Sequence, residues 1–180
     1  MGTLRPPVPV KLFIGMLSPK ASLFSACTDE LARTYGPLDF ESDLFPWNGT
    51  AYYREELGMN IIRKFIFFRE SRDPAELAAI KRFTIDMESR YSNTRDGVQQ
   101  RTINIDPGYV TEAKVVLATT KDFAHRIYIG QSIYAEVTLR YSTKERRFIP
   151  HEFTYPDFRT DTYCDLFKRV RENLRHSLGR

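Results

Sequence analysis

The sequence has few cysteines and no long apolar segment. Only Cys27 and Cys164 occur among 180 residues, and neither has a cysteine or histidine partner at a zinc-ligand spacing. We expect both to be buried, reduced thiols, as is usual in the cytosol. No apolar run approaches the roughly 18 residues of a membrane-spanning helix, and the proline-containing N-terminus does not resemble a signal peptide. These absences predict a cytoplasmic protein without a membrane partner.

Several catalytic signatures are missing as well. There is no GxxxxGK[ST] loop and no GxGxxG after a strand, which disfavours P-loop nucleotidases and dinucleotide-binding enzymes. A Gly-x-Ser-x-Gly elbow and an HExxH motif are also absent. No metal is expected, because no His, Cys, Asp and Glu residues have metal-ligand spacing. The sequence leaves open whether the protein is an enzyme, and it names no cofactor.

The composition that is present is that of a globular protein. Apolar residues make up 42% and charged residues 28%, and the formal net charge is +4. Residues 29–56 are acidic, whereas residues 61–101 and 144–180 each hold more basic than acidic side chains. These basic stretches favour an anionic partner, although a nucleic-acid-binding protein usually carries a denser basic stripe.

The first 106 residues alternate between strand and helix signals. Residues 10–17 form an almost wholly apolar run, typical of a strand buried on both faces. Ser18-Pro19 predicts a helix start and Gly36 its end, and the capping box at 73–76 starts a second long helix. Further strands are expected over 38–44, 61–68 and 101–106, with a short helix over 50–57. This order is α+β and ferredoxin-like (βαββαβ), an antiparallel sheet with both long helices on one face.

Residues 107–180 are expected to pack on that core, so that residues 1–180 form a single domain around residues 10–106. Asp106-Pro107-Gly108 is typical of a turn, and Thr111 is placed to cap a short helix over 111–117. A hairpin over 127–141 and a last helix from about residue 161 complete the chain. A hairpin turn at 130–132 pairs Ile129 with Ile133 and turns Ile127 and Ile129 to the apolar face.

Polar residues gather in two stretches, 104–126 and 151–159. Their hydroxyls, ammonium and guanidinium groups suit a phosphate or carboxylate. We therefore predict a site for a small anionic ligand, a phosphorylated one such as a nucleotide or an RNA end. His125 and Asp106 are the candidates for proton transfer. The candidate ligand-binding residues are Tyr109, Thr119, Thr120, Lys121, Arg126, Tyr155, Asp157 and Arg159.

These same residues have simpler structural interpretations. His125 lies on an apolar strand face, where a histidine is often a core residue with its hydrogen bonds satisfied. Arg126 lies opposite Glu136, an arrangement typical of a cross-strand ion pair. The loop at 155–159 can be ordered by aromatic packing alone.

A function of a different class is also consistent with the sequence. Residues 40–53 are aromatic and acidic, with Phe40, Phe45, Trp47, Tyr52 and Tyr53. The alternative is a non-catalytic protein-interaction or structural module that uses this segment or a homodimer contact, and it predicts an exposed apolar patch. A third alternative, RNA binding along the basic stretches, predicts a steep salt dependence.

Several short motifs follow one another along the chain: Gly15-Met16-Leu17-Ser18-Pro19, Gly36-Pro37-Leu38-Asp39-Phe40-Glu41-Ser42, Asp106-Pro107-Gly108-Tyr109, Leu117-Ala118-Thr119-Thr120-Lys121-Asp122, Ala124-His125-Arg126-Ile127-Tyr128 and Tyr155-Pro156-Asp157-Phe158-Arg159. Together they resemble one family of prokaryotic proteins, catalogued as domain of unknown function 4416. The resemblance extends from about residue 10 to the last helix, and it implies a single-domain bacterial or archaeal protein. It carries over no catalytic residues.

Overall fold

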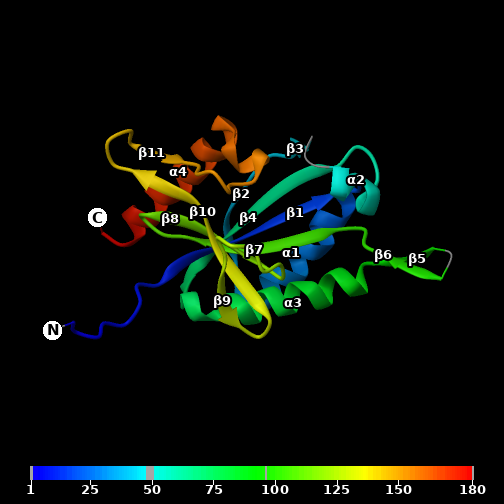
Figure 1. The fold of residues 1–180 in the computed structure, drawn as a ribbon, viewed down its shortest axis with the longest axis horizontal. Coiled ribbons are helices and arrows are strands. Elements are labelled where there is room, and N and C mark those ends of the chain that lie inside the picture. Colours follow the sequence, from blue (N-terminus) through cyan, green and yellow to red (C-terminus); the bar gives the residue numbers. More distant parts are fainter. Residues whose placement is uncertain (1, 48–50, 96, 180) are drawn as a thin grey trace.

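The computed structural model describes residues 2–47, 51–95 and 97–179, and within them the protein is α+β with a large antiparallel sheet. The sheet runs in the order β11-β10-β8-β7-β1-β4-β2, with β3 added to β4 and β9 added to β10 (Figure 1). Its strands are β1 (Val10–Ser18), β2 (Leu38–Glu41), β3 (Phe45–Pro46), β4 (Ile62–Arg72), β7 (Asn104–Val110), β8 (Lys114–Thr119), β9 (Ile127–Gly130), β10 (Ile133–Ser142) and β11 (Arg147–Ile149). The sheet in the structure is therefore larger than the one that the sequence predicts.

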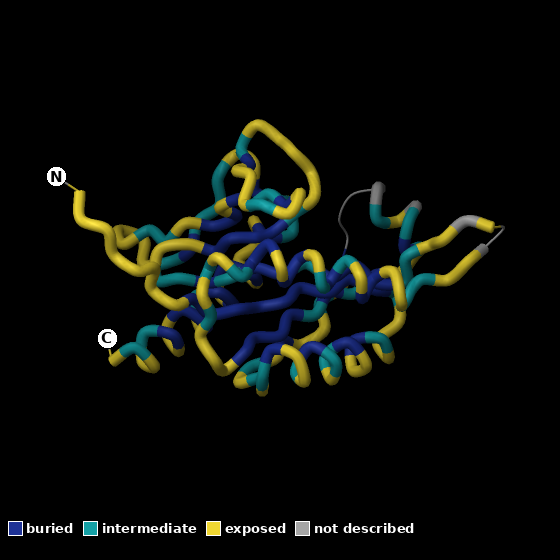
Figure 2. Tube along the Cα trace, turned by 90° about the horizontal axis from the view of Figure 1, so that it is seen from below, coloured by how far each residue is buried: buried dark blue, intermediate teal, exposed yellow. Residues whose placement is uncertain are grey.

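The helices cover both faces of this sheet. They are α1 (Ala21–Tyr35), α2 (Ala51–Leu57), α3 (Leu77–Arg90) and α4 (Asp161–Ser177), with single turns η1 (Pro74–Glu76) and η2 (Pro156–Arg159). None of the helices within the described residues is long and apolar enough to cross a bilayer. In Figure 2 the buried residues, in dark blue, follow the strands and the inner sides of the helices.

Strand β1 is buried along its whole length because each face packs on different helices. Leu12, Ile14 and Met16 belong to one core cluster with the apolar stripe of α1 and with Ile80 and Met87 of α3. Phe13 lies on the opposite face, where it packs with Phe65 and Phe67 of β4 and with α4. The alternation of side chains along a strand therefore divides the core into two layers.

Local signals that begin and end helices are mostly confirmed. Gly36, with φ of 94°, ends α1, and Asp73 and Glu76 form the expected capping box before α3. The prediction that Ser18 caps α1 is wrong, because Ser18 is the last residue of β1 and Lys20 is the N-cap. The Ser18 hydroxyl accepts the backbone N–H of Lys20 instead.

The expected turn at Asp106-Pro107-Gly108 and the helix over 111–117 are both wrong. Pro107 and Gly108 lie inside β7, and residues 114–119 form β8. Thr111 holds the tight connection between them, because its hydroxyl accepts the N–H groups of Ala113 and Lys114. The β-branched residues that follow pair with β7 on one side and β10 on the other, so tertiary pairing overrides the local helix start.

Two further segments differ from the expected pattern. Residues 92–100, for which the sequence predicts no strand, contain the hairpin strands β5 (Asn93–Arg95) and β6 (Val98–Gln100), with residue 96 outside the described part. In the β9–β10 hairpin, Tyr128 pairs with Tyr134, and Ile133 pairs with Gly130 instead of the predicted Ile129. The turn has two residues of positive φ, at 131 and 132. Ile127 and Ile129 are exposed.

Candidate functional site

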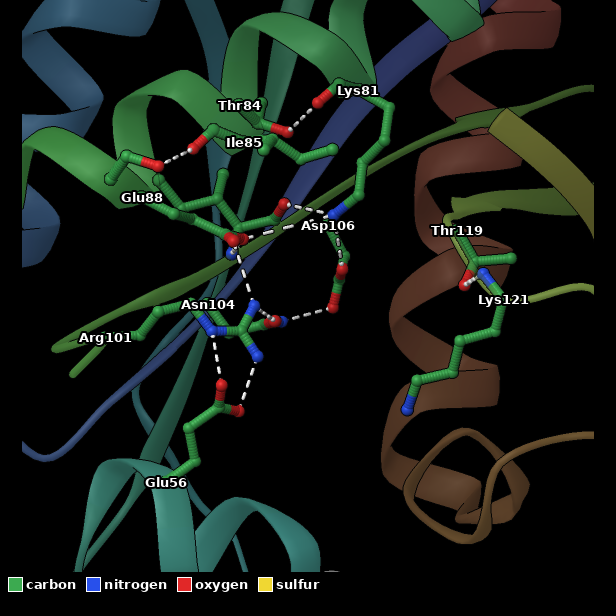
Figure 3. Close-up of polar contacts among 12 residues, drawn as sticks. Glu56, Lys81, Thr84, Ile85, Glu88, Arg101, Asn104, Asp106, Thr119 and Lys121 are labelled. Carbon is green, nitrogen blue, oxygen red and sulfur yellow. Dashed lines mark hydrogen bonds and ion pairs between the residues drawn. The ribbon is translucent and has the colours of Figure 1, made fainter. Parts of the chain in front are cut away.

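A cavity of about 130 Å³ lies where β7 and β8 part. The two strands pair from Val110 opposite Val115 to Gly108 opposite Leu117, and no pair follows. Pro107 has no N–H with which to extend the ladder. Beyond this point Asn104 and Asp106 face the cavity from one side and the end of β8 faces it from the other, as Figure 3 shows for Thr119 and Lys121.

Two charged side chains of α3 take the place of β8 along this free edge of β7. Lys81 donates to the carbonyl of Ile105 at 3.0 Å, and Glu88 accepts the N–H of the same residue at 2.6 Å (Figure 3). Both side chains are buried. A buried backbone group without a partner costs free energy comparable to a lost hydrogen bond. This requirement explains why a lysine and a glutamate lie under the sheet one heptad apart.

These side chains continue into a charged network along β7. Lys81 also donates to Asp106 at 3.0 Å, whose other oxygen accepts the amide of Asn104. Arg101 binds both carboxylate oxygens of Glu56 and donates to Glu88 at 2.9 Å. Three carboxylates and two cations thus surround this side of the cavity.

The network sets the ionisation of its carboxyl groups. Burial raises the pKa of Glu88, and the Lys81 and Arg101 cations offset only part of this effect. Burial works in the same direction on Asp106, but there the Lys81 ammonium and the Arg63 guanidinium outweigh it, so the pKa of Asp106 is lowered. Asp106 therefore faces the cavity as a carboxylate, which only accepts hydrogen bonds.

A second ion pair comes from β4 and the turn η2. Arg63 donates to Asp157 at 2.7 Å, and the indole N–H of Trp47 donates to the same oxygen at 3.1 Å. Burial disfavours the Arg63 cation, but the Asp157 carboxylate outweighs this and raises its pKa. Gly15 leaves space for this guanidinium, since a Cβ there would lie 3.2 Å from a terminal nitrogen of Arg63.

A third ion pair joins β10 to the segment that follows β8. Arg126 donates to Glu136 at 2.7 Å, which confirms the predicted ion pair, although Arg126 lies just before β9 and not in it. The same guanidinium donates to the carbonyl of Lys121 at 3.1 Å and to the hydroxyl of Tyr155 at 2.7 Å. Arg126 thereby ties the cavity's β8 side to the loop at 155–158.

The structure brings together six of the ten residues predicted for the site. Those that line the cavity are Asp106, Thr119, Thr120, Lys121, Tyr155 and Asp157. They come from three separate segments, which the parting of β7 and β8 and the turn η2 place around one hollow.

The other four do not line it. Tyr109 packs beside the cluster around Leu77 and Val116. His125 stacks on Phe153 at 4.5 Å and lies 3.1 Å from a Glu136 oxygen. The Arg126 side chain is 1% exposed, so it has no surface for a ligand. Arg159 donates to two backbone carbonyls of its own loop.

Sequence reasoning missed the cavity residues Arg63, Lys81 and Arg101. One signal was available for Arg63, which shares a strand face with Phe65 and Phe67 in an otherwise apolar segment. Lys81 lies four residues after Leu77 and three before Thr84, on the apolar stripe of the helix, so its position was an available signal although its charge is typical of an exposed side chain. Nothing local distinguishes Arg101 from an exposed arginine.

The aromatic segment 40–53 contributes to the interior. Phe40 packs on Phe67 and Phe45 on Tyr163, while Trp47 packs on Tyr53 and both line the cavity. Residues 48–50 and the side chain of Tyr52 lie outside the described part. Among the described aromatic residues of the segment, none is exposed.

The cysteines lie away from the cavity. Cys27 and Cys164 are buried and free, as expected. Burial, the largest effect, raises the pKa of the Cys27 thiol to about 12, so the nucleophilic thiolate is disfavoured. Within the described residues no group of His, Cys, Asp and Glu side chains is arranged to hold a metal ion.

The fold and cavity define an α+β protein whose strand edge, two helices and one turn surround a charged, aromatic-lined hollow. The chain belongs to the family described as Domain of unknown function (DUF4416), which matches residues 8–174. No curated protein and no solved structure matches the chain.

Proposed function

We propose that this cavity binds a small phosphorylated ligand, a nucleotide or the end of an RNA. The proposal rests on one observation: anion-binding groups and aromatic rings from distant segments line a single hollow. Thr119, Thr120 and Lys121 offer two hydroxyls and an ammonium for a phosphate. Perturbed titratable groups in a cavity are typical of functional sites.

Aromatic side chains form the rest of the wall. Trp47, Tyr53, Tyr155 and Phe158 line the same cavity, and rings of this kind stack on bases or on the apolar face of a sugar. In this proposal Asp106 contacts the ligand directly. His125 acts only through Glu136, and Arg126 positions Lys121 and Tyr155.

Removal of the Lys121 ammonium tests the proposal. We expect AMP, ribose 5-phosphate or inorganic phosphate to raise the melting temperature of the wild-type protein. Lys121→Ala should weaken binding roughly tenfold, because a charge-assisted hydrogen bond contributes on the order of 1.5 kcal/mol. Lys144→Ala removes an exposed lysine elsewhere and should leave affinity unchanged. Absence of stabilisation by all three anions in a thermal-shift assay would contradict the proposal.

The β9 edge supports a second candidate function, self-association. Residues 127–133 contain no charged side chain, β9 pairs with β10 alone among the described strands, and Ile127 is 72% exposed. Other exposed apolar side chains lie close by in sequence: Phe123, Tyr128, Ile129 and Val137. Proteins usually protect an uncharged strand edge, and a second copy of β9 pairs with it without burying charge.

Sedimentation equilibrium tests this contact. We expect the wild-type chain to form a dimer and Ile127→Lys to be monomeric, because the substitution places a charge in the contact. Met59→Lys introduces the same charge at a 70% exposed apolar residue elsewhere and should preserve the dimer. A monomeric wild-type chain at high micromolar concentration would contradict self-association.

We also propose that β2, β4, β1 and β7, with α1 and α3, form a ferredoxin-like unit. The four strands are neighbours in that order and each pair is antiparallel. Both helices pack on the same face, in agreement with the split βαβ arrangement. Strands β8, β10, β11 and β9 extend the unit from β7, and the cavity forms where β8 leaves β7.

A further inference from the structure

We infer that the ligand carries a sugar hydroxyl that donates to Asp106 while its phosphate binds at the end of β8, which makes it a ribose phosphate. This inference rests on the proposed function of the cavity. It follows from the different chemistry of two sides of the cavity: the β7 wall (Lys81, Arg101, Asn104 and Asp106) and the β8 wall (Thr119, Thr120 and Lys121).

The two walls differ in charge. On the β7 wall, Lys81 and Arg101 are in contact with three carboxylates, those of Glu56, Glu88 and Asp106. The β8 wall contributes one ammonium, two hydroxyls and no carboxylate. The ion pairs Arg63–Asp157 and Arg126–Glu136 are balanced and favour neither side. Coulomb interaction therefore directs a phosphate to the β8 wall and away from Asp106.

Asp106 is the carboxylate with the most room for a ligand. Its side chain is 23% exposed, compared with 16% for Asp157 and 2% for Glu136. Its two oxygens accept from Lys81 and Asn104, and a carboxylate has about four acceptor positions. A ligand group that lies against Asp106 must therefore donate a hydrogen bond.

The donor is a neutral group, which on a sugar phosphate is a hydroxyl, because an ammonium conflicts with Lys81. The Lys81 ammonium is 3.0 Å from one oxygen of Asp106, so a ligand ammonium on the same carboxylate would lie beside a like charge. A neutral hydroxyl meets no such repulsion. Figure 3 shows Asp106 and Lys121 from the two walls in one view, and both line the same cavity. A molecule with a phosphate at one end and hydroxyls at the other satisfies both walls.

Nucleotides that lack one hydroxyl test the inference without altering the protein. We expect AMP to bind the wild-type chain more tightly than 2′-deoxy-AMP or 3′-deoxy-AMP in isothermal titration calorimetry. The weaker deoxynucleotide should lose roughly 10- to 100-fold in affinity, the range for a hydrogen bond to a charged group. Inorganic phosphate should bind as well, since the β8 wall alone holds it.

Protein variants assign the effect to Asp106. In Asp106→Asn we expect AMP and the deoxynucleotides to bind with similar affinity, whereas Asp86→Asn, at an exposed carboxylate of α3, should keep the preference. If Asp106→Asn fails to fold, the comparison of AMP with the deoxynucleotides on the wild-type chain still tests the hydroxyl contact. A short RNA with a terminal phosphate distinguishes the two possible ligands, a mononucleotide and the end of an RNA. A site for an RNA end binds this RNA more tightly than AMP, whereas a mononucleotide site does not.

Two results would overturn the inference, and they differ. Equal affinity for AMP and both deoxynucleotides removes the hydroxyl contact but leaves the phosphate site intact. No binding of AMP, RNA or inorganic phosphate removes the proposed function together with the inference.

Discussion

Replacement of Gly108 by alanine is expected to lower the free energy of unfolding by about 3 kcal/mol, the upper end for an overpacked core. A Cβ at this position would lie 2.4 Å from the carbonyl oxygen of Val116 and 2.5 Å from the ring of Phe13. The first neighbour is backbone of β8, and the second is a fully buried ring between β4 and α4. Neither can move without disturbing the sheet.

Urea denaturation followed by circular dichroism measures this loss. Gly2→Ala adds the same methyl group where no atom lies within 4 Å, so its stability should match the wild type. Phe13→Leu in the Gly108→Ala background should recover only part of the loss, because it relieves the ring and leaves the carbonyl contact. A Gly108→Ala protein within about 0.5 kcal/mol of the wild type would contradict the close approach of β7 and β8.

Lys81→Met is expected to cost about 3 kcal/mol at pH 7, the cost of breaking a buried ion pair. Methionine fills the space of the lysine side chain but leaves the carbonyl of Ile105 unpaired and Asp106 without its ammonium. Glu88 loses the Lys81 ammonium, which lies 4.0 Å from it, but keeps its contacts with Arg101 and with the N–H of Ile105. The loss should therefore come from the free edge of β7.

The pH dependence of Lys81→Met identifies the charge effect. In the wild type, Lys81 and Arg63 lower the pKa of Asp106 against the effect of burial. This contribution is present above the unfolded pKa and is lost as pH falls through the folded one. The variant lacks the part of this contribution that comes from Lys81. At low pH Asp106 is protonated, so the variant then has no unpaired charge at this position. The stability difference between the two proteins should thus shrink from pH 7 to about pH 4. Lys114→Met, at an exposed lysine of β8, controls for loss of a surface charge; a difference that stays constant with pH would contradict this account.

Local chemistry predicted the N-terminal half of the fold well. The apolar run of β1, the stripe of α1 and the capping box of α3 each depend on residues within one or two turns of each other. The predictions of a turn and a helix over residues 106–117 were wrong, because Pro107-Gly108 and Thr111 are typical of a turn and of a helix cap when only their neighbours in sequence are considered. Their strands form because β1 and β10 offer partners far away in sequence.

The residues of the candidate site also divide into those that the sequence predicted and those that it did not. Thr119, Lys121 and Asp157 were predicted from their chemical groups and from their position at the ends of predicted elements. Lys81 and Glu88 were missed because charged side chains are usually exposed, although each follows a residue of the apolar stripe, Leu77 or Thr84, by four positions. They are buried because β8 leaves β7 at Pro107 and Ile105 then requires a donor and an acceptor.

The sequence by itself determined where most helices and strands begin and which residues form their apolar faces, and it singled out polar segments that meet at the cavity. Those properties depend on side-chain periodicity and on caps, which act over a few residues. Only the tertiary structure decided the extent of the sheet, the point where β7 and β8 part and the ion pairs around the cavity. Backbone hydrogen bonds between distant strands, and the need to satisfy them at a free edge, are not encoded in any local pattern.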